Sequence, residues 1–288
     1  MLDTHDAHSE HLLLCLRIPK SGSQSLEHAL ARTLAGRKRF YVPNTLELDG
    51  RLSRFQHLRF RRSQARNLLV HYRTRSLGHA LRHIDRESAP GDLLIGGHAD
   101  FRTLSSRLSI PLKMVTILRN PLDRCRSEYH YSRCKFLGKS RLERMDSSVL
   151  PRMAAKADFN SYIDFLFDHR EIYGNIAAAY LGLQPWDEIG RFFQKHVFHA
   201  GVLEEDTLFS RILGEKLGAN IQFPRLNVSG SAGQVVIGTH ARRKIEMLYA
   251  RDFEIYEFIL DEIIAPSACR SGGIKKWPVA EDLPAGHC

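Results

Sequence analysis

The chain has 288 residues, 43% of them hydrophobic and 26% charged, so it can bury a core, and global disorder is excluded. Its formal net charge is +10, which suits an anionic partner wherever the basic residues are concentrated. The longest apolar runs, 12–16 and 115–118, are far shorter than the ~20 residues that cross a bilayer, so no transmembrane helix is expected.

Cysteine usage and the N-terminal residues both bear on location. The five cysteines lie far apart and form neither a CxxC pair nor zinc-ligand spacing with the histidines. Residues 1–10 hold acidic side chains and histidines, whereas a secretory signal has a basic stretch followed by an apolar one. We therefore expect a cytoplasmic protein with reduced cysteines and no bound metal.

The apolar run 12–18 ends at Pro19 and is typical of a short buried strand, whereas residues 24–34 show helical spacing before Gly36. The same criteria predict further strands at 68–71, 93–96, 114–118 and 196–202. They predict helices at 159–168, 172–183, 207–217 and 241–264, the last with an irregularity inside it. Residues 137–152 are polar and basic and are expected to form a mobile loop or a short helix.

Strands that alternate with helices predict an α/β fold, in which a parallel sheet is covered by helices on both faces. No internal repeat, low-complexity tract or strong linker divides the chain, so a single domain is expected over residues 1–265. From Pro266 onward the chain mixes Ser, Gly, Lys and Pro, and residues 266–288 are expected to form a loosely attached tail.

The segment Arg17-Ile-Pro-Lys-Ser-Gly-Ser-Gln-Ser25 joins the first predicted strand to the first predicted helix. A helix start offers unpaired N–H groups and the positive end of the helix dipole, and Gly22 allows the backbone to close around a phosphate-sized anion. Further donors are the side chains of Lys20, Ser21, Ser23, Gln24 and Ser25. The alternative is a serine-rich cap with an incidental lysine. A Walker A loop is excluded, because its lysine would follow the glycines.

A second strand-to-helix turn lies within residues 115–129, where Pro121 opens the helix. Parallel strands end at the same edge of a sheet, so Arg119 and Ser127 can meet the ligand of the first turn. The arginine is suited to a bidentate contact with a phosphate. The alternative is a helix cap with a surface salt bridge.

The two segments together resemble the sulfotransferases that use 3'-phosphoadenylyl sulfate (PAPS), especially the carbohydrate O-sulfotransferases. In that family a PKTGSTS-type turn, here 19–25, grips the 5'-phosphosulfate, and an LRDPxxRxxSxY-type segment grips the 3'-phosphate through the residues matching Arg119 and Ser127. Residues 97–104 are similar to the HADWTEL segment of heparan sulfate 6-O-sulfotransferases, whose catalytic base corresponds to His98. Residues 224–229 resemble the loop that the family folds over the nucleotide, which adds Arg225 and Asn227 to the expected cofactor contacts.

This resemblance implies a P-loop-like three-layer α/β domain that moves the sulfuryl group from PAPS to a carbohydrate hydroxyl by in-line displacement, without a metal. Adenosine 3',5'-bisphosphate (PAP) is the implied product. Lys20 is expected to stabilise the leaving phosphate, and His98 to accept the proton of the hydroxyl, because imidazole titrates near neutral pH. Asp100 is expected to cap the next helix in preference to orienting the imidazole.

Three positions depart from the family pattern. Gln24 stands where Thr or Ser is usual and Asn120 where Asp is usual, while Phe101 replaces the tryptophan of the 6-O enzymes. Gln24 can still donate to a phosphate, but Phe101 weakens any assignment to the same sugar position. The membrane anchor of the Golgi enzymes is also missing, so a soluble, bacterial-type member is the expectation.

Nine arginines and no acidic residue lie between Gly50 and Ile84. The basic segment 51–82 is expected to attract an anionic acceptor, such as a carboxylated or sulfated glycan, and it can also contact a membrane surface peripherally. Its alternative is a solvated face. No helix-turn-helix, zinc-finger or RNP pattern accompanies the charge, so nucleic-acid binding is not expected.

Two other functions stay open at this stage. A nucleotide-dependent kinase on a similar scaffold would need a Walker A loop and a magnesium motif, and the sequence contains neither. A non-catalytic polyanion-binding protein would bind with a steep salt dependence and without preference for PAP.

Overall fold

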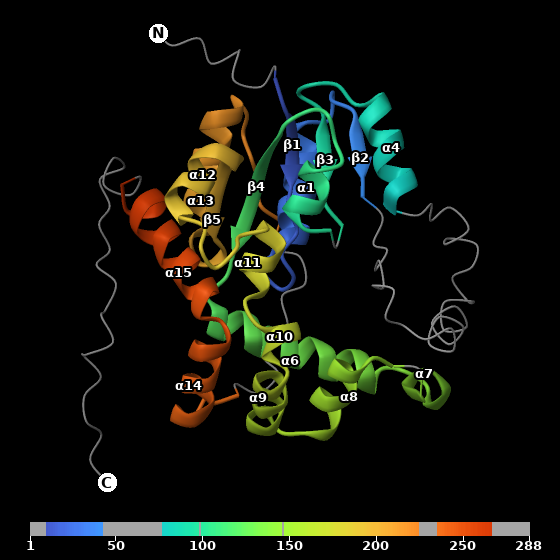
Figure 1. Ribbon diagram of the computed structural model, residues 1–288, viewed down its shortest axis with the longest axis vertical. Coiled ribbons are helices and arrows are strands. Elements are labelled where there is room, and N and C mark those ends of the chain that lie inside the picture. The colour runs from blue at the N-terminus through green and yellow to red at the C-terminus, as the bar shows by residue number, and fades with distance from the viewer. Residues whose placement is uncertain (1–9, 43–76, 98, 146, 225–234, 267–288) are drawn as a thin grey trace.

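A computed structural model describes residues 10–42, 77–97, 99–145, 147–224 and 235–266. Within these residues, one sheet of five strands has the order β2-β3-β1-β4-β5, and every neighbouring pair is parallel (Figure 1). The strands are β1 (Leu12–Cys15), β2 (Arg39–Tyr41), β3 (Leu93–Ile95), β4 (Leu112–Leu118) and β5 (Val197–Val202). The central parallel sheet predicted from the sequence is therefore confirmed.

Strand β1 lies at the centre of the sheet because both of its faces are apolar. Leu12 and Leu14 pack into one hydrophobic cluster, whereas Leu13 and Cys15 pack into another, as the alternation of side chains along a strand requires. All four side chains are buried. A strand of this kind is stable only between two layers of helices.

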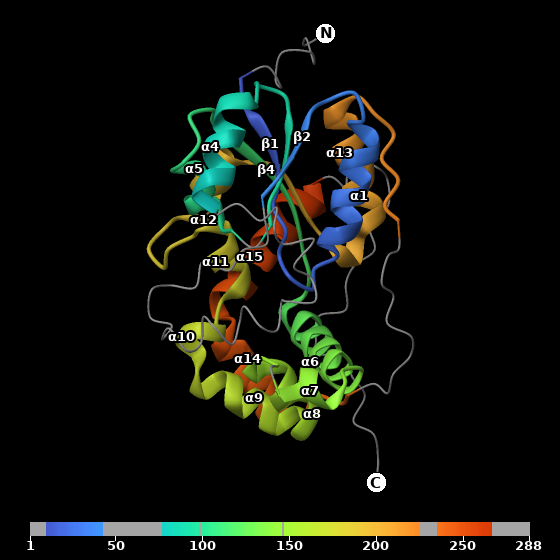
Figure 2. The ribbon, with the colours of Figure 1, turned by 90° about the vertical axis from the view of Figure 1, so that its right-hand side faces the viewer.

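Helices supply those two layers, and the three-layer prediction is confirmed. One face of the sheet is covered by α1 (Ser23–Thr33) and α13 (Asp206–Leu217). The opposite face is covered by α4 (Leu77–Glu87), α5 (Phe101–Ser105), α11 (Ile176–Leu181), α12 (Ile189–His196) and α15 (Ala250–Ile259). Figure 2 shows α1 and α13 on one side of the strands and α4, α5 and α12 on the other.

A further group of helices lies beyond the carboxyl ends of the strands, where β4 runs into α6 (Figure 1). It has its own hydrophobic cluster, to which α6 (Pro121–Leu137), α8 (Val149–Lys156), α9 (Phe159–Asp168) and α14 (Thr239–Leu248) contribute. The remaining elements are α7 (Arg141–Met145), α10 (Arg170–Tyr173), the 3-10 turn η2 (Leu203–Glu205) and the π-helical turn η3 (Leu260–Ile264). These helices therefore lie next to the edge of the sheet where the sequence predicts the site.

Several predicted elements are found within a few residues of their expected bounds. These are the strands at 12–18, 93–96, 114–118 and 196–202 and the helices at 24–34, 159–168 and 207–217. Strand β2 was not predicted, because its three residues are at least partly exposed and show no apolar run. The expected strand at 68–71 and most of the expected tail lie outside the described residues.

The predicted helix at 172–183 is wrong in one respect, because the chain breaks it between α10 and α11. A Cβ on Gly174 would lie only 2.5 Å from the carbonyl oxygen of Arg170, and Asn175 takes a left-handed conformation with φ of 45°. The apolar residues keep helical spacing from 172 to 183, but the backbone is not helical at Gly174 and Asn175. The helix at 241–264 divides at Tyr249 and ends in η3, as the expected irregularity indicated, and residues 137–152 contain α7 and the start of α8.

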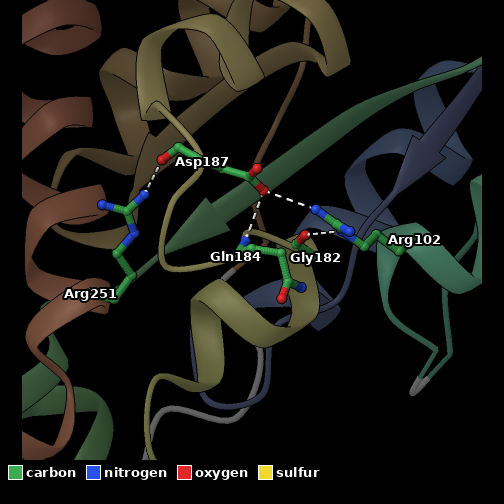
Figure 3. A network of polar contacts seen from close by, with 5 residues as sticks. All are labelled: Arg102, Gly182, Gln184, Asp187 and Arg251. Atoms are coloured by element: carbon green, nitrogen blue, oxygen red, sulfur yellow. Dashed lines mark hydrogen bonds and ion pairs between the residues drawn. The ribbon is translucent and has the colours of Figure 1, made fainter.

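Asp187 lies in the loop between α11 and α12 and links that loop to α5 and α15 (Figure 3). Its carboxylate accepts hydrogen bonds from Arg102 of α5 at 3.0 Å and from the backbone N–H of Gln184 at 2.8 Å. Arg102 also donates to the carbonyl oxygen of Gly182 at 2.6 Å, and Arg251 of α15 donates to the carbonyl oxygen of Asp187. These hydrogen bonds hold the loop between α11 and α12 against α5 and α15. No helix in the described part of the chain combines the length and hydrophobicity of a membrane span.

Candidate active site

Three strand ends emerge side by side at one edge of the sheet. Strand β1 pairs with β4 through Cys15 and Val115, and with β3 through Cys15 and Ile95. The pairing with β4 continues past β1, because the N–H of Leu16 donates to the carbonyl oxygen of Val115 at 3.0 Å. The turns that follow β1, β3 and β4 consequently leave the sheet together, at the edge where open α/β sheets bind ligands.

The turn from β1 into α1 is held in an unusual backbone conformation. Lys20 has φ of 66° and Gly22, the residue before α1, has φ of 77°, so both lie in the left-handed region. A Cβ on Gly22 would lie 2.7 Å from Cδ1 of Leu203, which explains why glycine is needed there. The residue before α1 is a glycine, which has no side chain to cap the helix, and this turn places a helix N-terminus at the edge of the sheet.

The serines of this turn differ from Gln24 in exposure. Ser21, Ser23 and Ser25 are at most 7% exposed, whereas the side chain of Gln24 is exposed. The hydroxyl of Ser21 is buried without a hydrogen-bond partner among the described residues. The turn therefore offers its backbone, Gln24 and Lys20 to an anion more directly than its serine hydroxyls.

Lys20 projects from the turn toward α6. Its Nζ lies 3.8 Å from the centroid of the Tyr131 ring. Burial lowers the pKa of Lys20, the carboxylate of Glu128 opposes this change, and the positive charges of Arg119 and Lys135 lower the pKa further. Charged side chains from the turn after β4 and from α6 thus act on the ammonium of Lys20.

The turn from β4 into α6 carries Arg119 and Asn120. Asn120 caps the helix, since its Oδ1 accepts the N–H of Leu122 at 3.0 Å and Pro121 begins the first turn. Asparagine therefore performs the capping that the usual aspartate would perform. Ser127 follows on α6 and is half-buried.

Asp100 caps α5, as the sequence predicted. Its carboxylate accepts hydrogen bonds from the backbone N–H of Thr103 at 2.9 Å and from the Thr103 hydroxyl at 2.7 Å. His98, Arg225 and Asn227 lie outside the described residues, as does the basic segment as far as residue 76. The neighbours of His98 in the sequence, Gly97 and Ala99, belong to the connection from β3 to α5.

The structure adds three residues of α6 that the sequence analysis did not single out: Glu128, Tyr131 and Lys135. Glu128 accepts a hydrogen bond from the hydroxyl of Ser132 at 2.8 Å, and Lys135 Nζ lies 5.5 Å from the Tyr131 ring centroid. The sequence contains a signal for them, because Glu128, Tyr131 and Lys135 are three and four residues apart, and such residues share one face of a helix. This spacing does not predict a site by itself, because the sequence does not indicate which face of the helix points to Lys20.

Lys20, Arg119 and Lys135 form no close ion pair within the described residues, since none of them lies within ion-pair distance of an acidic side chain there. Arg17, by contrast, pairs with Glu27 at 3.1 Å. Glu128 offsets part of the repulsion on Lys20, but Arg119 and Lys135 still lower its pKa, so the arrangement fits a ligand with several negative groups. The described residues contain no cluster of three or more potential metal ligands.

Comparison with known families decides the class of the protein. The model of the sulfotransferase domain matches residues 11–193, which is more than half of the chain. The chain belongs to the sulfotransferase family. A search of curated proteins gives no match. The matched residues contain the turns after β1, β3 and β4, and they end within α12.

Membership of this family establishes the reaction class. The protein is a transferase for sulfuryl groups, and sulfotransferases generally use PAPS as the donor. PAPS carries negative groups at both the 3' and the 5' position, which agrees with a helix start after β1 and with the cations Lys20 and Arg119 at neighbouring turns.

Proposed function

We propose that this sulfotransferase moves the sulfuryl group of PAPS to a hydroxyl of a carbohydrate by in-line displacement. The observation that carries the proposal is the position of Lys20 and Arg119. They leave adjacent parallel strands at one edge of the sheet, Arg119 acts electrostatically on Lys20, and neither forms a close ion pair among the described residues. Two cationic turns side by side suit a donor with two separate phosphate groups.

Lys20 is proposed to act at the leaving oxygen. In the transfer, a bond forms between the acceptor oxygen and sulfur while the bond from sulfur to the 5'-phosphate oxygen breaks, and the electron pair stays on that oxygen. The ammonium of Lys20 offsets the charge that develops there, and the N–H groups at the start of α1 bind the other phosphate oxygens. The left-handed conformation of Lys20 and Gly22 supports this role, because it turns the chain around the site before α1 begins.

Arg119 and Ser127 are proposed to hold the 3'-phosphate. Arg119 stands at the end of β4, and Ser127 lies on α6, the helix that the same turn begins. A guanidinium binds phosphate through two parallel hydrogen bonds, which fixes orientation as well as charge. Arg225 and Asn227 are proposed to contact the nucleotide on the strength of the family resemblance alone.

His98 is proposed as the general base that takes the proton of the acceptor hydroxyl. The proposal rests on the similarity of residues 97–104 to the 6-O-sulfotransferase segment and on their place in the connection after β3. Asp100 is engaged in capping α5, so the proposal assigns it no contact with the imidazole. The same similarity, with the basic segment 51–82, supports a carbohydrate acceptor, and the cysteine pattern supports a cytoplasmic location.

Calorimetric titration with PAP and with ATP tests the donor site. We expect PAP to bind more tightly, and Arg119→Ala to weaken PAP binding by about 10- to 100-fold, because a charge-assisted phosphate contact is lost. Lys20→Ala is expected to weaken the binding of both nucleotides, because both carry a phosphate at the 5' position, where Lys20 is proposed to act. Arg141→Ala removes an exposed arginine of α7 and serves as the control. Equal binding of ATP and PAP by the native protein would overturn the donor assignment.

Transfer of labelled sulfate from PAPS tests the base and the acceptor class. His98→Ala is expected to bind PAP normally while turnover with oligosaccharide acceptors collapses, and undiminished turnover would reassign the base. A panel of neutral, carboxylated and sulfated oligosaccharides tests the acceptor. Transfer to small phenols or alcohols but to no saccharide of the panel would overturn the carbohydrate assignment.

A further inference from the structure

Tyr131 lies on α6 between two lysine ammoniums and remains open to solvent. Its side chain is 49% exposed, although it sits beside the turn that carries Lys20. Lys20 Nζ is 3.8 Å and Lys135 Nζ 5.5 Å from the ring centroid, so the two ammoniums can be no farther apart than the sum of these distances. An exposed aromatic ring with two cations beside it is a surface that an acidic, partly apolar ligand can use.

Lys135 has no structural task that accounts for its position. Its side chain is exposed, and it pairs with no carboxylate in the described residues. Its positive charge also contributes to lowering the pKa of Lys20, against the opposing effect of Glu128, so the two ammoniums repel each other. An anionic group bound between the lysines would remove this repulsion.

Lys135 lies farther along α6 than Ser127, which is proposed to hold the nucleotide. Ser127 is followed by Tyr131 one turn later and by Lys135 two turns later, so Lys135 lies about 12 Å beyond Ser127 along the helix axis. Arg119 precedes the helix altogether. Lys20, at the proposed leaving oxygen, is influenced by both Arg119 and Lys135. The far side of Lys20 from the nucleotide is where an acceptor must approach for in-line transfer.

We propose that Tyr131 and Lys135 form an acceptor subsite for an acidic sugar residue. The Tyr131 ring packs against the apolar face of the sugar, and the Lys135 ammonium binds its carboxylate or sulfate group. This inference rests on the proposed carbohydrate acceptor and adds to it the charge of the sugar next to the reacting hydroxyl. Neither residue takes part in the bond exchange, so both determine acceptor specificity and affinity and not the chemistry itself.

Binding of a matched pair of saccharides to the PAP-loaded protein tests the subsite. The probes are an unsulfated chondroitin hexasaccharide and the same hexasaccharide with its carboxylates reduced to alcohols, so they differ only in charge. We expect the acidic form to bind about tenfold more tightly, and Lys135→Ala to remove this preference. Tyr131→Ala is expected to weaken both forms, while Tyr131→Phe, which keeps the ring, restores binding.

Two controls separate acceptor binding from other effects. Lys156→Ala removes an exposed lysine at the end of α8 and is expected to bind both hexasaccharides as the native protein does. Affinity for PAP alone is expected to be unchanged in Lys135→Ala, because the subsite lies on the acceptor side. A loss of PAP affinity in this variant would overturn the proposal and place Lys135 at the donor. Equal binding of the two hexasaccharides by the native protein, or binding of neither, would also overturn it.

Sulfate transfer measured on the same variants separates this inference from the proposed function. Transfer to saccharides that does not depend on Lys135 or on acceptor charge leaves the carbohydrate acceptor standing and overturns the subsite. Lys135-dependent binding of the acidic hexasaccharide without transfer to any saccharide supports the subsite and overturns the proposed carbohydrate acceptor.

Discussion

The carboxylate of Glu204 accepts a hydrogen bond from the backbone N–H of Asn120, with 3.0 Å between Oε1 and the nitrogen. Glu204 belongs to η2, directly after β5, and Asn120 directly follows Arg119. The contact therefore fixes the peptide that leads from Arg119 into α6. The side chain of Glu204 is exposed, yet partial desolvation raises its pKa, while the Asn120 N–H and the charge of Arg119 oppose the change. The orientation of Arg119 consequently depends on a residue from the neighbouring strand.

Glu204→Ala is expected to weaken PAP binding by about tenfold, because loss of a hydrogen bond to a charged group loosens the turn that carries Arg119. Affinity for adenosine 5'-monophosphate, which has no 3'-phosphate, is expected to change little. Glu204→Gln keeps an oxygen acceptor for the N–H and is expected to retain most of the affinity. Calorimetry with both nucleotides checks this. Equal losses for the two nucleotides would show that Glu204 stabilises the whole site and does not act through Arg119.

Gly22→Ala is expected to abolish most nucleotide binding without preventing folding. The residue has φ of 77°, and its new methyl group would lie 2.7 Å from Cδ1 of Leu203. A left-handed non-glycine residue costs about 1–2 kcal/mol, and the close contact adds to that cost. Nucleotide affinity and thermal unfolding measure the two effects. The matched control is Gly36→Ala, because a Cβ there meets nothing within 4 Å and φ is not in the left-handed region.

The double variant Gly22→Ala/Leu203→Ala separates the two causes. Removing the Leu203 side chain relieves the close contact but leaves the backbone strain, so partial recovery of stability is expected relative to Gly22→Ala. No recovery would indicate that Leu203 moves aside easily and that strain accounts for the whole loss.

Prediction from sequence succeeded where the determining contacts are local. The turn at Lys20 and the helix start at Pro121 follow from short segments, and Asp100 caps α5 through Thr103, three residues away. The alternation of β1 between two apolar layers could also be predicted, because a four-residue apolar run needs two covering faces.

The parts that were missed depend on contacts distant in sequence. Glu204 meets Asn120 across 84 residues, and no local pattern indicates that pairing. The start of α6 at Pro121 was predicted, but only the tertiary structure shows that the face with Tyr131 and Lys135 meets Lys20. At the break after Gly174, the N–H of Asn175 donates to the carbonyl oxygen of Leu248 at 3.1 Å, and Leu248 belongs to the distant helix α14.

His199 is expected to make the stability of the protein depend on pH. It is buried in β5 and stacked on Phe209, with ring centroids 4.9 Å apart, and burial lowers its pKa to about 3. The unfolded chain binds a proton near pH ~6.5, so between these values the unfolded state carries more protons than the folded state. Stability is therefore full above about pH 6.5 and falls by up to about 1.4 kcal/mol per pH unit as the pH decreases.

Urea unfolding of His199→Phe at pH 7 and pH 5 measures this contribution. The variant is expected to lose less stability than the native protein between the two pH values, because its side chain cannot take up a proton. His28→Gln, which changes an exposed histidine of α1, is expected to keep the native dependence. An unchanged slope in His199→Phe would mean that other groups cause the acid sensitivity.

Asp252 and Arg124 form a buried pair that joins α15 to α6, with 3.8 Å between Oδ2 and Nη2. The carboxylate of Asp252 also accepts the N–H groups of Ala177 and Ala178 at 3.0 and 2.9 Å, so it caps α11 at the break after Gly174. Asp252→Ala would leave Arg124 buried without its partner and the start of α11 without its acceptor. Removal of one partner from such a pair costs about 3–5 kcal/mol.

Asp252→Ala is therefore expected to lower the unfolding temperature strongly, while Asp252→Asn, which keeps one carbonyl acceptor for α11, is expected to lower it less. Glu215→Ala breaks the exposed pair of Glu215 with Arg211, 2.7 Å apart on α13, and is expected to change stability little, because water screens exposed pairs. Thermal and urea unfolding of the three variants give the comparison. A loss in Asp252→Ala no larger than that in Glu215→Ala would show that the packing of α15 against α6 does not depend on the pair.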